Sequence, residues 1–367
     1  MRQPWLLLTL IPLVSLPVPA WGQVSAGIAE PLGNHQFSGQ VNQLIAQISI
    51  DEDFIQRPLN RPVRDLRNDA DTLLRLGEAE ERRGSLEKAI PFWLEALELY
   101  QMVRDEQAIG RTLELLGITY GNLGQLREAE ATLRQRLAIA RDNQDITGQI
   151  YGLNNLGAIL VKRRSYAAAN ALFNEALTVS RRVNSAAGEG LSLSNLGLLA
   201  FSMGDFDEAI KRYEAALRFR RSPQDPIGEV NTLLGLAESY RLLNQYRQAM
   251  VNYFDALRTS RIIRDVANEF RILAGMHTTY LAMNQPELAL KALDERMLLA
   301  QQTQNEPQEL NTLITYGRFY NTVGDRLEAK NYLERAIALA ASLGDTGQEA
   351  ALKNELAQVI FILDRTN

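Results

Sequence analysis

The sequence predicts an all-helical protein built as a solenoid of seven helical hairpins. Three observations predict it: turn-forming residues recur every 40 positions, one alanine and one leucine recur in step with them, and the apolar residues between them have helical spacing. The composition agrees, because 46% hydrophobic and 23% charged residues are typical of a folded globular chain. The recurring turn positions are Gly84, Gly124, Arg164, Gly204, Asn244, Asn284 and Gly324.

Residues 1–22 have the features of a secretory signal peptide. Arg2 gives a positive start, Trp5 to Val14 form an apolar run, and the small residues Ala20 and Gly22 allow cleavage after either one. An uncleaved membrane anchor is the alternative, but the run is shorter than the ~20 apolar residues that a span needs. We therefore expect an exported protein, periplasmic or extracellular, with no stable membrane span once the signal is removed.

Residues 23–64 form a lead-in segment before the repeats. Val41 to Ile48 has the pattern of one short amphipathic helix. The prolines Pro31, Pro58 and Pro62 predict that the remainder is extended or only partly ordered.

Residues 65–344 hold seven repeats of 40 residues without insertion or deletion. Within one repeat, Leu193, Leu196 and Ala200 are spaced for one helix face, and Phe206 and Ala209 begin a second helix after the turn. Each repeat is therefore a pair of helices. The alanine column is Ala89, Ala129, Ala169, Ala209, Ala249, Ala289 and Ala329, and the leucine column is Leu73, Leu113, Leu153, Leu193, Leu233, Leu273 and Leu313.

The start of each first helix is marked by a side chain that can accept a hydrogen bond from the free N–H groups there. Residues 345–367 continue with helical spacing at Leu352, Leu356 and Ile360, which predicts a C-terminal helix that caps the last hairpin. The predicted cap residues are Asp65, Asp105, Asp145, Ser185, Asp225, Asp265, Asn305 and Asp345.

The fourth repeat carries a family resemblance. Its runs Leu193-Ser194-Asn195-Leu196-Gly197, Gly204-Asp205-Phe206 with Ala209, and Tyr213-Glu214-Ala215-Ala216-Leu217 resemble the tetratricopeptide repeat in a 40-residue form. The resemblance implies a right-handed superhelical solenoid that holds an extended peptide in an inner groove. It implies a non-catalytic scaffold or assembly factor for protein partners.

Two alternatives stay open beside that function. Export and a full-length array are similar to the periplasmic tetratricopeptide factors that aid photosystem II assembly and handle manganese, although no residue is diagnostic of them. A structural or oligomerising module without a peptide ligand is the other alternative. The sequence leaves the oligomeric state undetermined.

Residues that commonly serve in catalysis or metal binding are scarce in this chain. It has no cysteine, and its two histidines, His35 and His277, lack the spacing of metal ligands. We therefore predict no enzyme activity, no cofactor and no metal site, and we expect His277 to pack inside a helix pair. A net charge of −5 predicts that nucleic acid is not the partner.

The first helices of the third to fifth repeats carry the predicted groove. Asn155 and Asn195 can both donate to and accept from the main chain of a bound peptide, and the family resemblance implies the same role for them. Leu198 and Phe201 would hold its apolar side chains, unless they pack on a neighbouring helix instead. The full set of candidate binding residues is Tyr151, Asn154, Asn155, Lys162, Asn195, Leu198, Phe201, Asn231 and Arg241.

A basic column lies near the ends of the second helices, at Arg141, Arg181, Arg221 and Arg261. We expect these cations to interact with the helix dipole and the terminal carbonyl groups. Further positive charge near the same region leaves an acidic partner segment open. These residues are Lys162, Arg163, Arg164, Arg182, Lys211, Arg212, Arg218 and Arg220.

Overall fold

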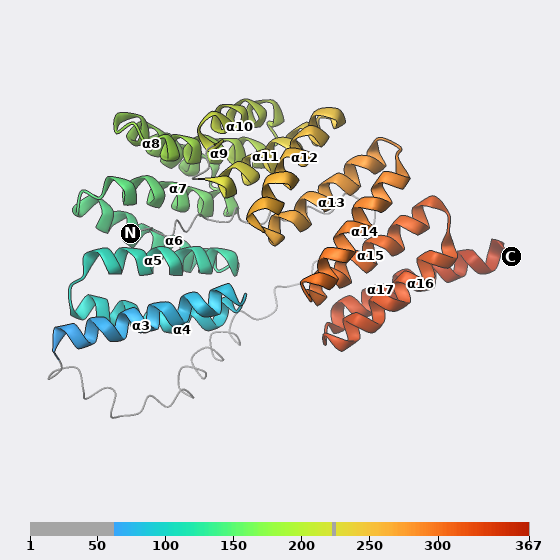
Figure 1. The fold of residues 1–367 in the computed structure, drawn as a ribbon, viewed down its shortest axis with the longest axis horizontal. Helices are drawn as coiled ribbons and strands as arrows, with labels where there is room; N and C mark the ends of the chain where they lie inside the picture. The colour runs from blue at the N-terminus through green and yellow to red at the C-terminus, as the bar shows by residue number, and fades with distance from the viewer. Residues whose placement is uncertain (1–61, 222–224, 367) are drawn as a thin grey trace, which may run out of the picture. The chain divides into compact units, whose positions relative to one another are not determined.

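The computed structural model describes residues 62–221 and 225–366, which form the helices α3 to α17 and contain no strand (Figure 1). The all-helical prediction is confirmed. The predicted signal peptide and most of the predicted lead-in lie outside the described residues. The first helices of the repeats are α3 (Val63–Arg82), α5 (Glu106–Asn122), α7 (Ile146–Lys162), α9 (Ala186–Ser202), α11 (Pro226–Leu242), α13 (Val266–Ala282) and α15 (Glu306–Val323).

The second helices complete the hairpins, and one more helix follows the array. They are α4 (Leu86–Met102), α6 (Leu126–Asp142), α8 (Tyr166–Arg182), α10 (Phe206–Arg220), α12 (Tyr246–Ile263), α14 (Pro286–Gln302) and α16 (Arg326–Ser342), and the helix after the array is α17 (Thr346–Thr366).

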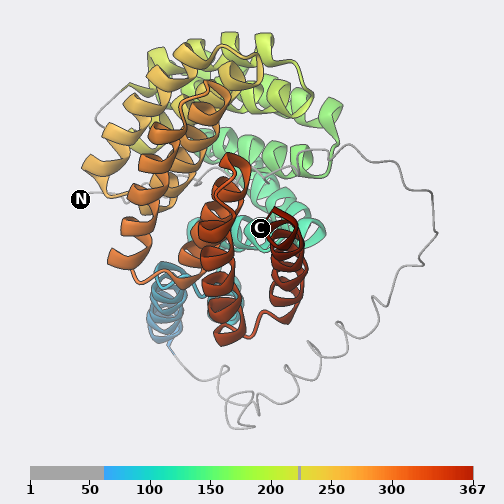
Figure 2. The same ribbon diagram turned by 90° about the vertical axis from the view of Figure 1, so that its right-hand side faces the viewer.

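The chain divides into two compact units, and the boundary falls within α7 between Gly152 and Leu153. In the first unit, α3 packs on α4, and α5 packs on α6. In the second unit, each helix from α8 to α17 contacts the next one along the chain. Figure 2 shows α16 and α17, coloured dark red, as neighbouring helices at the end of this series.

The turns of the hairpins share one backbone geometry. Every turn position predicted from the 40-residue period has a positive φ, from 56° at Asn284 to 90° at Gly324. A second series one half-repeat later, which includes Arg104 and Asn184, also has positive φ. The left-handed residue lets the next N–H reach back into the helix, as the Asp205 N–H does to the Ala200 carbonyl at 2.9 Å.

The predicted helix caps are confirmed at seven of eight positions, where the side chain accepts the N–H three residues later at 2.8–3.2 Å. The exception is Asp65. The helix α3 begins at Val63, Pro62 occupies the cap position without a side-chain bond, and Asp65 lies in the first turn. Proline cannot continue a helix toward its N-terminus, so the start is fixed directly after Pro62.

The core of each hairpin forms where small and large side chains meet. The alanine column is completely buried, with 0% exposure in all seven repeats. A Cβ atom added at Gly197 would lie 2.8 Å from the Tyr213 ring, so only glycine allows this approach of the two helices. In the sixth repeat His277 replaces this glycine and is buried, with Nδ1 3.0 Å from the Ala289 carbonyl oxygen. The prediction that His277 is a packing residue is confirmed.

Candidate functional site

The first helices in the middle of the array are buried on nearly every side. In α9 every residue from Gly190 to Ala200 is buried, because α9 packs against α8, α10 and α11. The second helix of the same hairpin, α10, buries only one stripe. That stripe is Ala209, Tyr213, Ala216, Leu217 and Arg220.

Buried polar side chains connect the first helices of consecutive repeats. Asn195 Nδ2 in α9 donates to Asn154 Oδ1 in α7 at 2.9 Å, and Asn154 Nδ2 donates to Ser192 Oγ at 3.1 Å. All three side chains are at most 7% exposed. These bonds orient the amides, because a buried polar group is costly unless it is hydrogen-bonded.

The same arrangement continues along the array. The Ser194 and Thr232 hydroxyl groups lie 2.8 Å apart between α9 and α11, and Asn268 Nδ2 in α13 donates to Asn231 Oδ1 in α11 at 3.0 Å. We call the side chains that form these hydrogen bonds between first helices the polar ladder. Its members are Asn154, Ser192, Ser194, Asn195, Asn231, Thr232 and Asn268.

Four of the seven side chains of the polar ladder were not predicted from the sequence. Ser192, Ser194, Thr232 and Asn268 were missing from the candidate set. Their signal is small polar residues inside otherwise apolar first helices, at separations of 37 to 41 residues that match neighbouring repeats. A search for polar pairs at about one repeat length would have found them.

The candidate binding residues divide by burial. Asn154, Asn155, Asn195, Leu198 and Asn231 are buried. The half-buried residues are Tyr151, Lys162, Phe201 and Arg241. Their role in binding stays a prediction, because burial alone does not identify a ligand site.

The half-buried candidates have distinct surroundings. Phe201 meets Phe206 edge-to-face, with ring centroids 5.4 Å apart, across the turn of its own hairpin. Arg241 donates to Glu238 Oε2 at 2.7 Å, and Glu238 also accepts from the Tyr253 hydroxyl. Burial lowers the pKa of the Lys162 ammonium to about 8, because the charged form is the one that loses hydration.

Within the basic column, Arg181, Arg221 and Arg261 pair with carboxylates. Arg181 Nε lies 3.4 Å from Glu189, and Arg261 Nε lies 2.7 Å from Glu269, in each case on the next first helix. Arg221 Nε likewise lies 3.7 Å from Glu229 on α11. Arg141, Arg181 and Arg261 lie in the last turn of their helices, as an interaction with the helix dipole requires. The glutamate eight residues later adds a side-chain ion pair at Arg181 and Arg261.

The described residues were also compared with two further features, the composition of metal sites and that of membrane-spanning helices. Residues 62–221 and 225–366 contain no cluster of three potential metal-binding side chains of the His, Cys, Asp or Glu types. In the same ranges, no helix combines the length and the apolar character that crossing a bilayer requires.

The chain is similar in fold to several solved structures. One is the Rap conjugation gene regulator of the plasmid pLS20 in complex with the Phr* peptide, with 18% identity, a TM-score of 0.57, and coverage of 84% of this chain and 89% of that one. Another is a Rap protein complexed with Competence and Sporulation Factor, with 16% identity, a TM-score of 0.56, and coverage of 82% and 77%.

A third is the apo form of the quorum sensor NprR from B. thuringiensis, with 15% identity, a TM-score of 0.52, and coverage of 89% of this chain and 95% of that one. At these identities the similarity concerns the fold. No curated protein matches the sequence.

Family models give the assignment. One model described as tetratricopeptide repeat matches residues 68–142 and 149–222, and a second one with the same description matches residues 310–343. The matched segments coincide with hairpins whose turns, caps and alanine column repeat every 40 residues. The chain belongs to the tetratricopeptide repeat family.

Proposed function

We propose that this protein is a non-catalytic scaffold that binds an extended peptide, or an extended segment of a partner protein, along the first helices of its third to fifth repeats. The observation that carries the proposal is the polar ladder. It places amide and hydroxyl groups in fixed orientations along α7, α9, α11 and α13. Because these groups are buried and bond one another, the ladder fixes the first helices relative to one another. The half-buried Lys162, Phe201 and Arg241 on the same helices are then the side chains that a peptide would reach.

Preorganisation is the physical advantage of this arrangement. A binding surface whose helices can still shift loses conformational freedom when a peptide binds, and this loss weakens the complex. Asn195 is already held by Asn154. The half-buried Phe201 and Arg241 would then add an apolar contact and a charge at the ends of their helices. Two proteins of similar fold, described above, were solved with a peptide or a factor bound, and this supports a peptide as the ligand class.

Site-specific photo-crosslinking tests the proposal. A benzoylphenylalanine placed at Phe201, at the end of the first helix α9, reports on the proposed surface. The same probe at Phe254, which is 51% exposed on the second helix α12, is the matched control. We expect the partner to be captured in the native cell envelope from position 201 and not from position 254. Equal capture from both positions, or capture from 254 alone, would overturn the assignment.

The alternatives are separated by two further measurements. A calorimetric titration with Mn²⁺ that shows saturable heat would favour a metal-handling assembly factor. Light scattering that shows a stable oligomer, together with no crosslinked partner, would favour the oligomerising module.

We also propose that the protein acts outside the cytoplasmic membrane, because residues 1–22 have the charge, the apolar run and the small residues of a signal peptide. Cell fractionation followed by N-terminal sequencing tests this location. A mature chain that begins at Trp21 or Gln23 is the expected result. A cytoplasmic chain that retains Met1 would contradict it.

A further inference from the structure

The arginines Arg221 and Arg261, at the C-terminal ends of second helices, have two kinds of carboxylate partner in the fifth and sixth repeats. Besides its glutamate on the next first helix, Arg261 contacts Glu295 on the next second helix at 2.6 Å. Arg221 likewise lies 3.8 Å from Asp255, and Asp255 also accepts from Arg258 at 3.1 Å. One carboxylate at position 255 thus interacts with two guanidinium groups.

The fourth repeat lacks this carboxylate. Position 215, which is 40 residues before Asp255, is an alanine. The two arginines equivalent to those around Asp255 are nevertheless present as Arg181 and Arg218. Arg181 retains Glu189 as its partner at 3.4 Å, and its side chain is 60% exposed.

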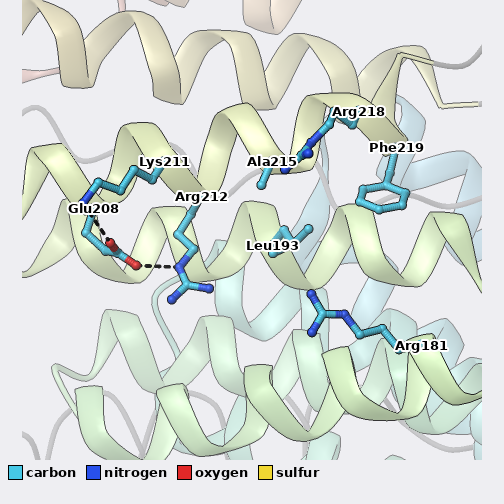
Figure 3. Close-up of a pocket in the computed structure, with 8 residues that line it drawn as sticks. All are labelled: Arg181, Leu193, Glu208, Lys211, Arg212, Ala215, Arg218 and Phe219. Carbon is cyan, nitrogen blue, oxygen red and sulfur yellow. Dashed lines mark hydrogen bonds and ion pairs between the residues drawn. The ribbon is translucent and has the colours of Figure 1, made fainter.

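An open cavity of about 450 Å³ lies where the missing carboxylate would be. Figure 3 shows Arg181 reaching it from α8, while Lys211, Arg212 and Arg218 come from α10. Glu208 is the acidic residue of the lining, and it lies with Arg212 at 2.7 Å and with Lys211 at 3.8 Å. The lining therefore has four cationic side chains and one carboxylate, and that carboxylate pairs with Arg212 and Lys211.

We propose that this cavity binds a carboxylate side chain from an acidic segment of a partner protein, in the place that Asp255 occupies one repeat later. Guanidinium groups bind carboxylates through paired, charge-assisted hydrogen bonds. Leu193 and Phe219 in the same lining provide apolar contact for the stem of the incoming side chain. A protein carboxylate is favoured over a nucleic acid, because the chain already uses Asp255 and Glu295 in this way and because its net charge is −5.

This surface is separate from the one in the proposed function, because its cations stand on the second helices α8 and α10. Binding can be measured with the full-length protein and a fluorescein-labelled hexaglutamate peptide, followed by fluorescence anisotropy at low ionic strength, with hexaglutamine as the uncharged control. We expect saturable binding of hexaglutamate and none of hexaglutamine.

Three variants test the location. Arg218→Ala removes one of the two arginines, and Ala215→Glu supplies the missing carboxylate from within the chain. Each should weaken hexaglutamate binding by about tenfold or more, because a charge-assisted hydrogen bond is lost or already occupied. Arg258→Ala is the matched control, since it is the same exposed residue one repeat later, beside an internal carboxylate. It should leave the affinity unchanged.

Several outcomes would overturn the proposal: no binding of hexaglutamate to the unmodified protein, equal losses in Arg218→Ala and Arg258→Ala, or full affinity in Ala215→Glu with unchanged circular dichroism. Displacement of the peptide by inorganic phosphate or single-stranded DNA at lower concentrations than free hexaglutamate would assign the cavity to another class of anion. Crosslinking at Phe201 is independent of these variants, so either proposal can fail alone.

Discussion

The two helices of the fourth repeat differ in how much of their surface is buried. In α9 the side chains face neighbouring helices on several sides, so its polar residues find partners within the protein, as Asn195 does in Asn154. In α10 one stripe is buried and the remaining side chains are half-buried or exposed, with Lys211 73% exposed. The comparison shows that each side chain of the first helix must fit several neighbouring helices at once. The outward face of the second helix is left to vary in charge with little effect on folding.

The largest effect should come from truncating the buried first helix. Leu233 in α11 is 0% exposed, and Leu233→Ala should cost roughly 2–5 kcal/mol, because a cavity replaces packed atoms. Val251→Ala on the outward face of α12, where the side chain is 62% exposed, should change stability by less than about 0.5 kcal/mol. Urea unfolding followed by circular dichroism measures both. Similar losses would remove the distinction between the two helices.

An intermediate effect is expected within the polar ladder. Ser194→Ala removes the hydrogen bond between the Ser194 and Thr232 hydroxyl groups, while Thr232 keeps its bond to the Gly228 carbonyl, and should cost about 0.5–1.5 kcal/mol. Replacing both partners, as Ser194→Ala with Thr232→Val, should cost less than the sum of the single changes. Additive losses in this double-mutant cycle would show that the two hydroxyl groups do not stabilise each other.

A smaller, pH-dependent effect should arise from the tyrosines on both helix types. Burial, and then a hydrogen bond to Glu214, raises the pKa of Tyr240 to about 12, and burial raises that of Tyr213 above its ordinary value. An unfolded tyrosine loses its proton near pH 10, before the folded one. The stabilising contribution is therefore complete below pH 10 and is lost as the pH rises toward 12.

Tyrosinate absorbance and unfolding measured together test this pH dependence. Tyr213 should ionise only as the protein unfolds, whereas the more accessible Tyr240 should begin to ionise in the folded state. Ionisation of Tyr213 before the loss of helicity would contradict the burial of the α10 stripe. Tyr213→Phe provides the control that identifies its signal.

The features that the sequence predicted well are local and repeated. The caps and the alanine column depend on a few neighbouring residues, so seven copies of the same pattern identify them. Asp65 was wrong as a cap because the cap position is Pro62, three residues earlier, and the first helix begins at Val63. The partners of Asn154 and Asn231 depend on how one repeat stacks on the next, and the spacing within a single helix does not contain that information.

The missing carboxylate at Ala215 is an intermediate case, visible in the sequence but not interpretable from it alone. The sequence has Glu175, Asp255 and Glu295 at the equivalent positions. The sequence does not show that Asp255 and Glu295 contact Arg221 and Arg261, so the loss of an ion pair at Ala215 could not be inferred from it. The basic residues were noticed from the sequence, but the cavity between them required the structure.

The left-handed turns have a consequence for how such a gene can change length. Because equivalent turn residues, such as Gly84 and Gly124, have nearly the same φ, the chain returns to the same local backbone state after each 40 residues. Joining one turn to its counterpart a repeat later would delete a whole hairpin and leave the junction geometry intact. Duplications and losses in steps of one repeat should therefore be tolerated far better than the insertion of a single codon inside a helix, which would rotate every following side chain out of its place.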